Sequence, residues 1–146
     1  MFRVVMWLFV AFALICRFGL YMRSMKKILF IEDELALREA FKDYLTKNGY
    51  VVECVSDGAT GVDVAKKGKP DLVLLDLILP KKSGFQVLAE LKKDTATADI
   101  PVMVLTNLES PTDIDRVMEA GAVAYLIKTN YQLTEVLEKI RTVIGG

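Results

Sequence analysis

Short apolar runs and longer amphipathic stretches alternate along most of the chain. Five runs of four or five residues are mostly continuous in apolar character, as expected of strands that helices cover on both faces. They are Ile28–Ile31, Val51–Val55, Leu72–Leu75, Val102–Leu105 and Ala124–Ile127. Five such strands separated by helical segments predict right-handed crossovers and a five-stranded parallel sheet.

The segments between these runs carry apolar residues at helical spacing. Three stripes of this kind are expected to pack on the sheet rather than to bind a ligand. They consist of Leu37, Ala40, Phe41, Tyr44 and Leu45; of Ile114, Val117 and Met118; and of Leu133, Val136, Leu137, Ile140 and Ile144. Asn48-Gly49 is typical of a helix end, and Ser110-Pro111 is typical of a helix start with Ser110 as the N-cap. The pattern predicts a doubly wound α/β domain over residues 25–146, whose ligands bind at the carboxyl ends of the strands.

Residues 1–24 differ sharply from this pattern. Val4–Cys16 contains no polar side chain other than one cysteine thiol, and a run long enough to span a bilayer must include Arg17. We expect a hydrophobic helix here, and two interpretations stay open. One is a marginal membrane anchor through residues 4–22, whose basic flanks would leave the domain in the cytoplasm. The other is that Met25 is the true start; a cleaved signal peptide is less favoured, because no small-x-small site follows the apolar run.

Composition excludes several classes of function. The chain has 19 basic and 19 acidic residues, and residues 25–146 have sixteen basic against nineteen acidic. That balance predicts no direct nucleic-acid binding. The sequence has no histidine, which excludes histidine-based acid–base catalysis, histidine-ligated metals and a phospho-histidine donor. Cys16 and Cys54 make no disulfide or metal pattern, and Cys54 is expected to be a buried, reduced thiol.

Polar residues follow four of the five predicted strands at their carboxyl ends. The first strand runs into Glu32 and Asp33, the third into Asp76, the fourth into Thr106 and the fifth into Lys128. Clustered carboxylates repel one another unless a cation neutralises them, and hard oxygen ligands suit Mg²⁺. A lysine and a hydroxyl beside that cation would complete a pocket for a phosphoryl group.

These stretches, in this order, resemble the receiver domain of two-component response regulators over about residues 26–144. The stretches that carry the resemblance are KKILFIEDE, LVLLDLILPKKSGFQVL, PVMVLTN and GAVAYLIK. Receivers have a flavodoxin-like sheet with strand order 2-1-3-4-5, so the resemblance implies that fold. It also implies a stand-alone regulator similar to the chemotaxis receivers.

The resemblance implies a metal-dependent phosphoacceptor. Asp76 would take the phosphoryl group, and Asp33 and Asp76 would bind Mg²⁺ directly with the backbone carbonyl of Ile78. Glu32 would act through a metal-bound water. An acid at a strand end can also be an ordinary helix N-cap, which is the default interpretation of Glu34.

The resemblance also implies how the phosphoryl group is sensed. Thr106 would hydrogen-bond one phosphoryl oxygen, Lys128 would pair with another, and Tyr125 would turn inward when Thr106 moves. Pro80 and Gly84 match the loop after the acceptor, where glycine tolerates a backbone conformation that other residues avoid.

Two features depart from the family pattern, and a third bears on the same site. Most receivers have proline after the lysine, whereas Thr129 follows Lys128, and a cis bond before threonine costs about 3 kcal/mol. The loop must therefore hold a costly cis bond or take another path. Asn107 is larger than the small residue usually found there and could restrict access to the phosphoryl group. Ile78 and Leu108 would present apolar surface to an attacking water, so we expect slow self-dephosphorylation.

We expect a phosphorylation switch rather than an enzyme with an outside substrate. A sensor histidine kinase or a histidine phosphotransfer protein would phosphorylate it in the cytoplasm. Only Gly145 and Gly146 follow the last stripe, so we expect output by contact with a downstream protein, through the fourth helix, fifth strand and fifth helix of the domain. One alternative is a pseudo-receiver, against which the complete set of site residues argues. The other is a phosphatase or phosphotransferase of a different α/β family, which usually has a second acid where this chain has Ile78.

Overall fold

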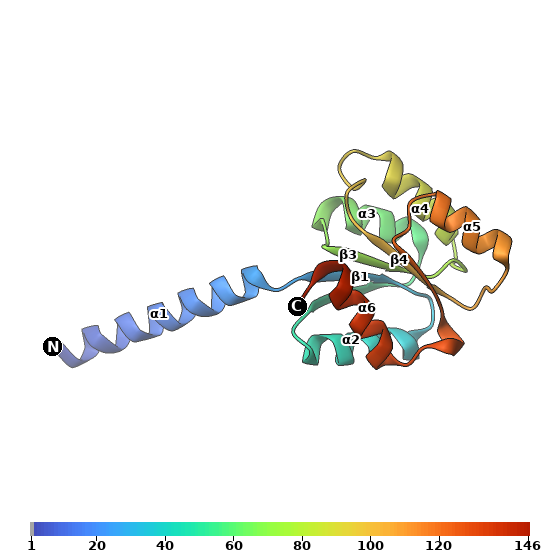
Figure 1. Cartoon of the computed structure of the whole chain (residues 1–146). Coiled ribbons are helices and arrows are strands. Elements are labelled where there is room, and N and C mark those ends of the chain that lie inside the picture. Colours follow the sequence, from blue (N-terminus) through green and yellow to red (C-terminus); the bar gives the residue numbers. More distant parts are fainter. Residues whose placement is uncertain (1) are drawn as a thin grey trace.

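A computed structural model describes residues 2–146, and it describes the side chains of residues 6–7, 9–20 and 25–146 (Figure 1). A long N-terminal helix precedes an alternation of strands and helices. The elements are α1 (Phe2–Ser24), β1 (Lys27–Ile31), α2 (Leu35–Lys47), β2 (Val51–Val55), α3 (Gly58–Gly68), β3 (Leu72–Leu75), α4 (Gly84–Lys93), β4 (Val102–Thr106), α5 (Pro111–Glu119), β5 (Ala124–Ile127), the 3₁₀ helix η1 (Lys128–Asn130) and α6 (Leu133–Ile144).

The five strands form one parallel sheet in the order β2-β1-β3-β4-β5. This confirms the predicted flavodoxin-like fold. Three strands have the predicted bounds, while β1 begins one residue earlier, at Lys27, and β4 ends one residue later, at Thr106. The strand order reverses at β1, which lies between β2 and β3, and because all strands are parallel the loops after β1 and β3 meet at the carboxyl edge of the sheet.

Alternate side chains of the strands point to opposite faces, and each face carries its own apolar core. On one face Ile28, Phe30 and Leu74 pack with residues of α2 and α6. On the other face Leu29 and Leu75 pack with residues of α3, α4 and α5. Figure 1 shows the same two layers of helices around the sheet. Burial on both faces explains why the strands are continuous apolar runs in the sequence.

The helix ends agree in part with the prediction. Gly49 follows α2 with φ of +94°, so it is the residue that needs left-handed freedom. Asp57 caps α3 by accepting a 2.8 Å hydrogen bond from the backbone N–H of Thr60. Ser110 occupies the N-cap position of α5 and Glu34 that of α2, but neither side chain makes a capping hydrogen bond. The predicted N-cap position of Ser110 is confirmed, although its hydroxyl makes no capping hydrogen bond.

The N-terminal segment is a helix, as predicted, and it extends away from the domain (Figure 1). Its described apolar side chains are exposed, among them Trp7 and Phe9. Within the described part of the chain, no helix combines the length and the apolar character that crossing a membrane requires. The expectation of a transmembrane anchor through residues 4–22 is thus not supported.

Both cysteines are free, and Cys54 is half-buried rather than buried as predicted.

Candidate functional site

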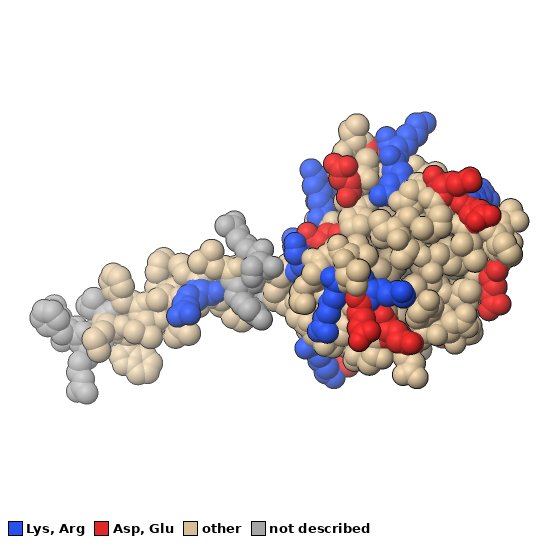
Figure 2. Space-filling model, viewed as in Figure 1, with Lys and Arg blue, Asp and Glu red and all other residues tan. Residues whose placement is uncertain are grey.

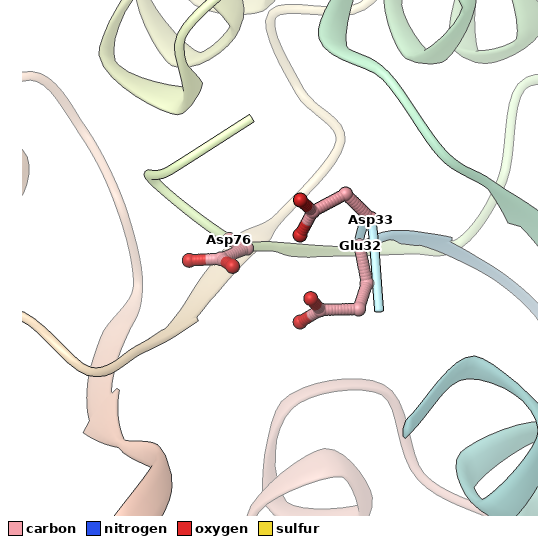
Figure 3. Close-up of side chains that lie close together, drawn as sticks. All are labelled: Glu32, Asp33 and Asp76. Carbon is pink, nitrogen blue, oxygen red and sulfur yellow. The ribbon is translucent and has the colours of Figure 1, made fainter. Parts of the chain in front are cut away.

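Three carboxylates meet at the carboxyl edge of the sheet. Ile31 of β1 lies opposite Leu75 of β3, so the residues that follow these two strands are neighbours. Glu32, Asp33 and Asp76 each place a carboxylate oxygen within 4.8 Å of the others. In Figure 3 the three side chains, two from the end of β1 and one from the end of β3, turn toward a common space. The sequence prediction that these acids converge is borne out by the geometry.

The side chain of Glu32 is buried, and hydrogen bonds hold both its backbone and its carboxylate in place. Its side chain is 1% exposed. Its backbone N–H donates to the carbonyl of Val55 at 3.1 Å, and its Oε1 accepts from the backbone N–H of Glu34 at 3.2 Å. Burial raises the pKa of the Glu32 carboxyl, and the nearby negative charge of Asp76 acts in the same direction. Asp33, in contrast, is exposed at the rim of the site.

Lys128 brings a positive charge to this cluster. Its Nζ donates to Oδ2 of Asp76 at 2.9 Å and lies 2.5 Å from Oε2 of Glu32. Burial lowers the pKa of the ammonium group, but the contacts with the two carboxylates outweigh burial, and the pKa of Lys128 is raised overall. Lys128 is therefore a permanent cation in this arrangement.

The loop after β5 takes a path that avoids a cis peptide bond. Among the described residues no peptide bond is cis, and Lys128, Thr129 and Asn130 form the short helix η1 directly after the strand. The alternative of a costly cis bond before Thr129 is thus excluded for this structure. The different loop still delivers the Lys128 ammonium to Asp76.

Thr106 ends β4 and is fully buried. Its Oγ1 and the Oε2 of Glu32 are both shielded from solvent, and within the described part of the chain neither atom has a hydrogen-bond partner. Glu32 Oε2 touches Lys128 as an ion pair, without the alignment of a directed hydrogen bond. Buried hydroxyl groups are rarely left unpaired, so Thr106 Oγ1 suits a ligand that brings its own polar groups. A hydrated Mg²⁺ beside the acids and a phosphoryl oxygen beside Thr106 have that chemistry.

A pocket of about 240 Å³ opens over the acids. Its lining residues follow the ends of four strands, β1, β3, β4 and β5: Glu32, Asp33, Glu34, Asp76, Ile78, Asn107 and Lys128. The backbone N–H of Ile78 donates to Oδ1 of Asp76 at 3.3 Å, which places the Ile78 peptide beside the acceptor carboxylate. The Ile78 side chain is 59% exposed, whereas Leu108 is half-buried. Of the two apolar residues expected at the site, Ile78 alone lines this pocket.

Tyr125 lies in β5, which β4 separates from β3, the strand that ends at Asp76. Its hydroxyl donates to the backbone carbonyl of Leu108 at 2.9 Å, so it contacts the loop that follows Thr106. Burial raises the pKa of the phenol. The ring is already positioned to respond to a movement of that loop, although its role as a switch stays a prediction.

Gly84 is required for a reason other than the predicted one. Its φ is not positive; the left-handed residue in this loop is Lys81, with φ of +65°. A Cβ on Gly84 would lie 2.2 Å from the backbone oxygen of Asp76 and 2.5 Å from the Cα of Leu77. Glycine is needed here because α4 begins directly against the backbone of the acceptor. Pro80 lies between the acceptor and α4, as the resemblance implied.

Arg38, on the first turn of α2, was not among the predicted site residues. Its Nη1 donates to the backbone carbonyls of Glu32 at 2.7 Å and Asp33 at 2.8 Å. The available signal was its position, one helical turn after the pair of acids. Helical spacing alone does not distinguish such an arginine from a solvated one, which is why the sequence did not reveal this contact.

The fold and the site together define a doubly wound α/β domain with an acidic pocket and a lysine at its carboxyl edge. The family described as the response regulator receiver domain matches residues 28–141. The chain therefore belongs to the receiver domains of two-component response regulators.

Individual relatives agree with this assignment. The chain is 38% identical over 120 residues to the DNA-binding dual master transcriptional regulator RpaA of Synechocystis sp.. The matched stretch covers 82% of this chain and 49% of RpaA. The chain thus spans about half the length of the curated relatives it matches. The BeF₃-activated N-terminal receiver domain of RstA from Klebsiella pneumoniae is 30% identical, with a TM-score of 0.76 and coverage of 83% of this chain and 100% of that one.

A third relative bears on the metal. The receiver domain of a sensor histidine kinase from Pseudomonas aeruginosa is 26% identical, with a TM-score of 0.75 and coverage of 84% of this chain and 100% of that one. Its structure has a magnesium ion coordinated in the active-site cleft. The present chain has a cluster of three acids, Glu32, Asp33 and Asp76, whose oxygens lie close enough together to hold a metal ion.

Proposed function

We propose that this chain is a phosphorylation switch in a two-component phosphorelay, with Asp76 as the acceptor of the phosphoryl group. The observation that carries the proposal is the arrangement around Asp76. Two other acids lie within 4.8 Å, an ammonium group lies 2.9 Å away, and the buried hydroxyl of Thr106, at the end of the neighbouring strand β4, has no partner among the described residues. No simple role in folding accounts for this concentration of buried and unpaired polar groups.

The chemistry follows from the groups present. A carboxylate oxygen of Asp76 attacks the phosphorus of a phospho-histidine, the phosphorus–nitrogen bond breaks, and the imidazole leaves with the electron pair and takes up a proton. The product is an acyl phosphate on Asp76. Lys128 is placed to pair with an oxygen of the transferred group, and Thr106 has a free hydroxyl to donate to another. Hydrolysis ends the phosphorylated state: water attacks the phosphorus, the bond to the Asp76 oxygen breaks, and the carboxylate and inorganic phosphate are released.

The acids are suited to hold Mg²⁺. Asp33 and Asp76 would be direct ligands together with the carbonyl of Ile78, and Glu32 would accept from a metal-bound water. When bound, Mg²⁺ neutralises the carboxylates and the developing charge on the phosphoryl oxygens. The protein side chains orient the acceptor and surround the transferred group.

The test uses a small phosphodonor. The chain is incubated with acetyl phosphate, with or without Mg²⁺, and its intact mass is measured. We expect the wild-type chain to gain one phosphoryl group only when a divalent cation is present. Asp76→Asn should gain none, whereas Asp63→Asn, which removes an exposed acid on α3, should match the wild type. Labelling of Asp76→Asn at the wild-type rate would show that another residue is the acceptor.

The same experiment separates the two alternatives. A pseudo-receiver gains no phosphoryl group under any condition. A phosphatase or phosphotransferase of another α/β family releases phosphate from acetyl phosphate over many turnovers. We propose neither, and expect the chain to catalyse only its own phosphorylation and dephosphorylation, without turnover of an outside substrate.

We further propose that the output is contact with another protein. The named relatives include transcriptional regulators, but residues 25–146 have sixteen basic against nineteen acidic residues. Figure 2 shows basic and acidic side chains interspersed on the visible face of the domain. The surface of α5, β5 and α6 supports a protein contact, because Met118 on α5 is 41% exposed and Val123 before β5 is 46% exposed. Beryllofluoride, which mimics the phosphoryl group, should shift amide resonances on this surface in the wild type and not in Asp76→Asn.

The donor we propose is a sensor histidine kinase or a histidine phosphotransfer protein, since the sequence has no histidine of its own. Such donors obtain their phosphoryl group from ATP, so we propose that the domain works in the cytoplasm. Transfer from a radiolabelled phospho-histidine protein to the chain, and its loss in Asp76→Asn, tests the donor class. A membrane contact through residues 4–22 is not required by this proposal, because none of the described residues of α1 lines the pocket or belongs to the acidic cluster.

A further inference from the structure

Two of the three acids proposed above to hold the cation, Glu32 and Asp33, lie in the turn between β1 and α2. Glu32 is fixed by burial and by hydrogen bonds to Val55 and Glu34. Asp33 has no such support from its side chain, which is exposed and makes no hydrogen bond within the described part of the chain. The direction in which its carboxylate points is therefore set by the backbone of the turn.

Arg38 is the side chain that holds this backbone. A single guanidinium nitrogen, Nη1, donates to the carbonyl of Glu32 at 2.7 Å and to the carbonyl of Asp33 at 2.8 Å. Two successive peptide groups are thereby oriented toward one donor. Charge-assisted hydrogen bonds of this length are among the stronger ones, and the planar guanidinium restricts their direction. The backbone N–H of Arg38 also bonds to the carbonyl of Glu34, so the residue is anchored on α2.

We propose that Arg38 is a positioning residue for the divalent cation, acting through the turn that carries Glu32 and Asp33. The inference rests on the proposed function of this site. Without the clamp, the peptide between the two acids is free to rotate, and the Asp33 carboxylate no longer points steadily at the space that it shares with Asp76. Binding of the cation then has to order the turn, which weakens it.

The sign of the effect separates positioning from electrostatics. Arg38 is a cation beside a cation site, so removing its charge alone would strengthen Mg²⁺ binding. Loss of the clamp acts in the opposite direction. A weaker affinity in a variant that has lost this positive charge can therefore arise only through the geometry of the turn or through general loss of folding, and thermal unfolding distinguishes these two causes.

The experiment measures Mg²⁺ binding by isothermal titration calorimetry in four full-length chains. Arg38→Met keeps an unbranched, flexible side chain and removes the charge and the donors; Arg38→Lys keeps the charge and one donor group. Lys42→Met removes the same charge from an exposed position one turn further along α2 and is the matched control. Thermal unfolding without Mg²⁺ and the amide resonances of Asp33 and Glu34 are recorded for each chain.

We expect Arg38→Met to weaken Mg²⁺ binding by about fivefold or more, Arg38→Lys to recover part of the loss, and Lys42→Met to stay within about twofold of the wild type. The amide resonances of Asp33 and Glu34 should broaden or shift in Arg38→Met at a temperature where the chain is fully folded. An affinity in Arg38→Met equal to or tighter than that of the wild type overturns the inference and leaves the proposed function intact. Absence of Mg²⁺ binding by the wild-type chain overturns the proposed function instead; the clamp is then judged by the resonances alone, and unchanged resonances overturn it.

Discussion

The ammonium group of Lys128 lies 2.9 Å from Oδ2 of Asp76, across a loop that begins with a trans peptide bond before Thr129. The same ammonium is 2.5 Å from Oε2 of Glu32. One lysine from the end of β5 thus bridges acids from the ends of β1 and β3. The ion pairs of Lys128 therefore connect the edge strand β5 with the central strands β1 and β3 at the place where the phosphoryl group is proposed to bind.

Replacing Lys128 with alanine should preserve Mg²⁺ binding and abolish the coupling between phosphorylation and the surface. Its positive charge opposes a nearby cation, so the metal should bind at least as tightly without it. Its contact with a phosphoryl oxygen is lost, and charge-assisted contacts of this kind are worth about 1.5–3 kcal/mol. The amide resonances around Tyr125 should respond less to beryllofluoride in Lys128→Ala.

The matched control is Lys67→Ala, which removes an exposed lysine from α3. This variant should show the wild-type response to beryllofluoride. A full response around Tyr125 in Lys128→Ala would falsify the proposed role of the lysine.

Asp33→Asn should weaken Mg²⁺ binding by about tenfold or more, because it removes a charged oxygen ligand from the cluster. Glu34→Gln is the control, since it neutralises the next acid in the chain, whose side chain makes no capping hydrogen bond. Calorimetric titration with Mg²⁺ measures both variants. Equal losses in the two variants would mean that the total negative charge of the turn, rather than Asp33 itself, determines the affinity.

Gly84→Ala should lower the free energy of unfolding by about 1–3 kcal/mol, because the new methyl group must displace the backbone of Asp76 and Leu77. Phosphorylation should slow as well, since the acceptor moves with its backbone. Gly68→Ala is a control in which nothing lies within 4 Å of the added Cβ. Urea unfolding and the initial rate of labelling by acetyl phosphate measure the two effects. Wild-type stability in Gly84→Ala would show that the start of α4 shifts easily.

The parts of the fold that follow from local pattern could be predicted from the sequence. Strands buried on both faces leave continuous apolar runs, and these located all five strands to within one residue. The alternation of strands and helices then implied where the carboxyl ends meet, and hence that Glu32, Asp33 and Asp76 converge. This part of the site follows from topology alone.

The parts that depend on the path of a loop could not be predicted in this way. Ser110 has the right identity and position for an N-cap, but the direction of its hydroxyl depends on the loop after β4. Gly84 was assigned to a backbone conformation, whereas its true constraint is the close approach of Asp76. Arg38 contacts the turn through its guanidinium group, and no pattern in the sequence reports the direction of an arginine side chain.

Removing residues 1–24 should leave the switch intact. The two apolar cores in the described part of the chain contain no residue before Ile28, and α1 extends away from the domain (Figure 1). Residues 25–146 should therefore unfold with a free energy within about 0.5 kcal/mol of the full chain, and should be phosphorylated at the same rate with Mg²⁺. The shorter chain should also self-associate less, because it lacks exposed side chains such as Trp7, which is 80% exposed.

Urea unfolding, labelling by acetyl phosphate and light scattering compare the two chains side by side. The control for labelling is Asp76→Asn in each length, which should take no phosphoryl group in either. A large loss of stability in the shorter chain would place the N-terminal helix within the folded unit and move the domain boundary upstream of Met25. Equal stability with slower labelling would instead mean that α1 acts on the site without supporting the fold, which its position away from the carboxyl edge of the sheet argues against.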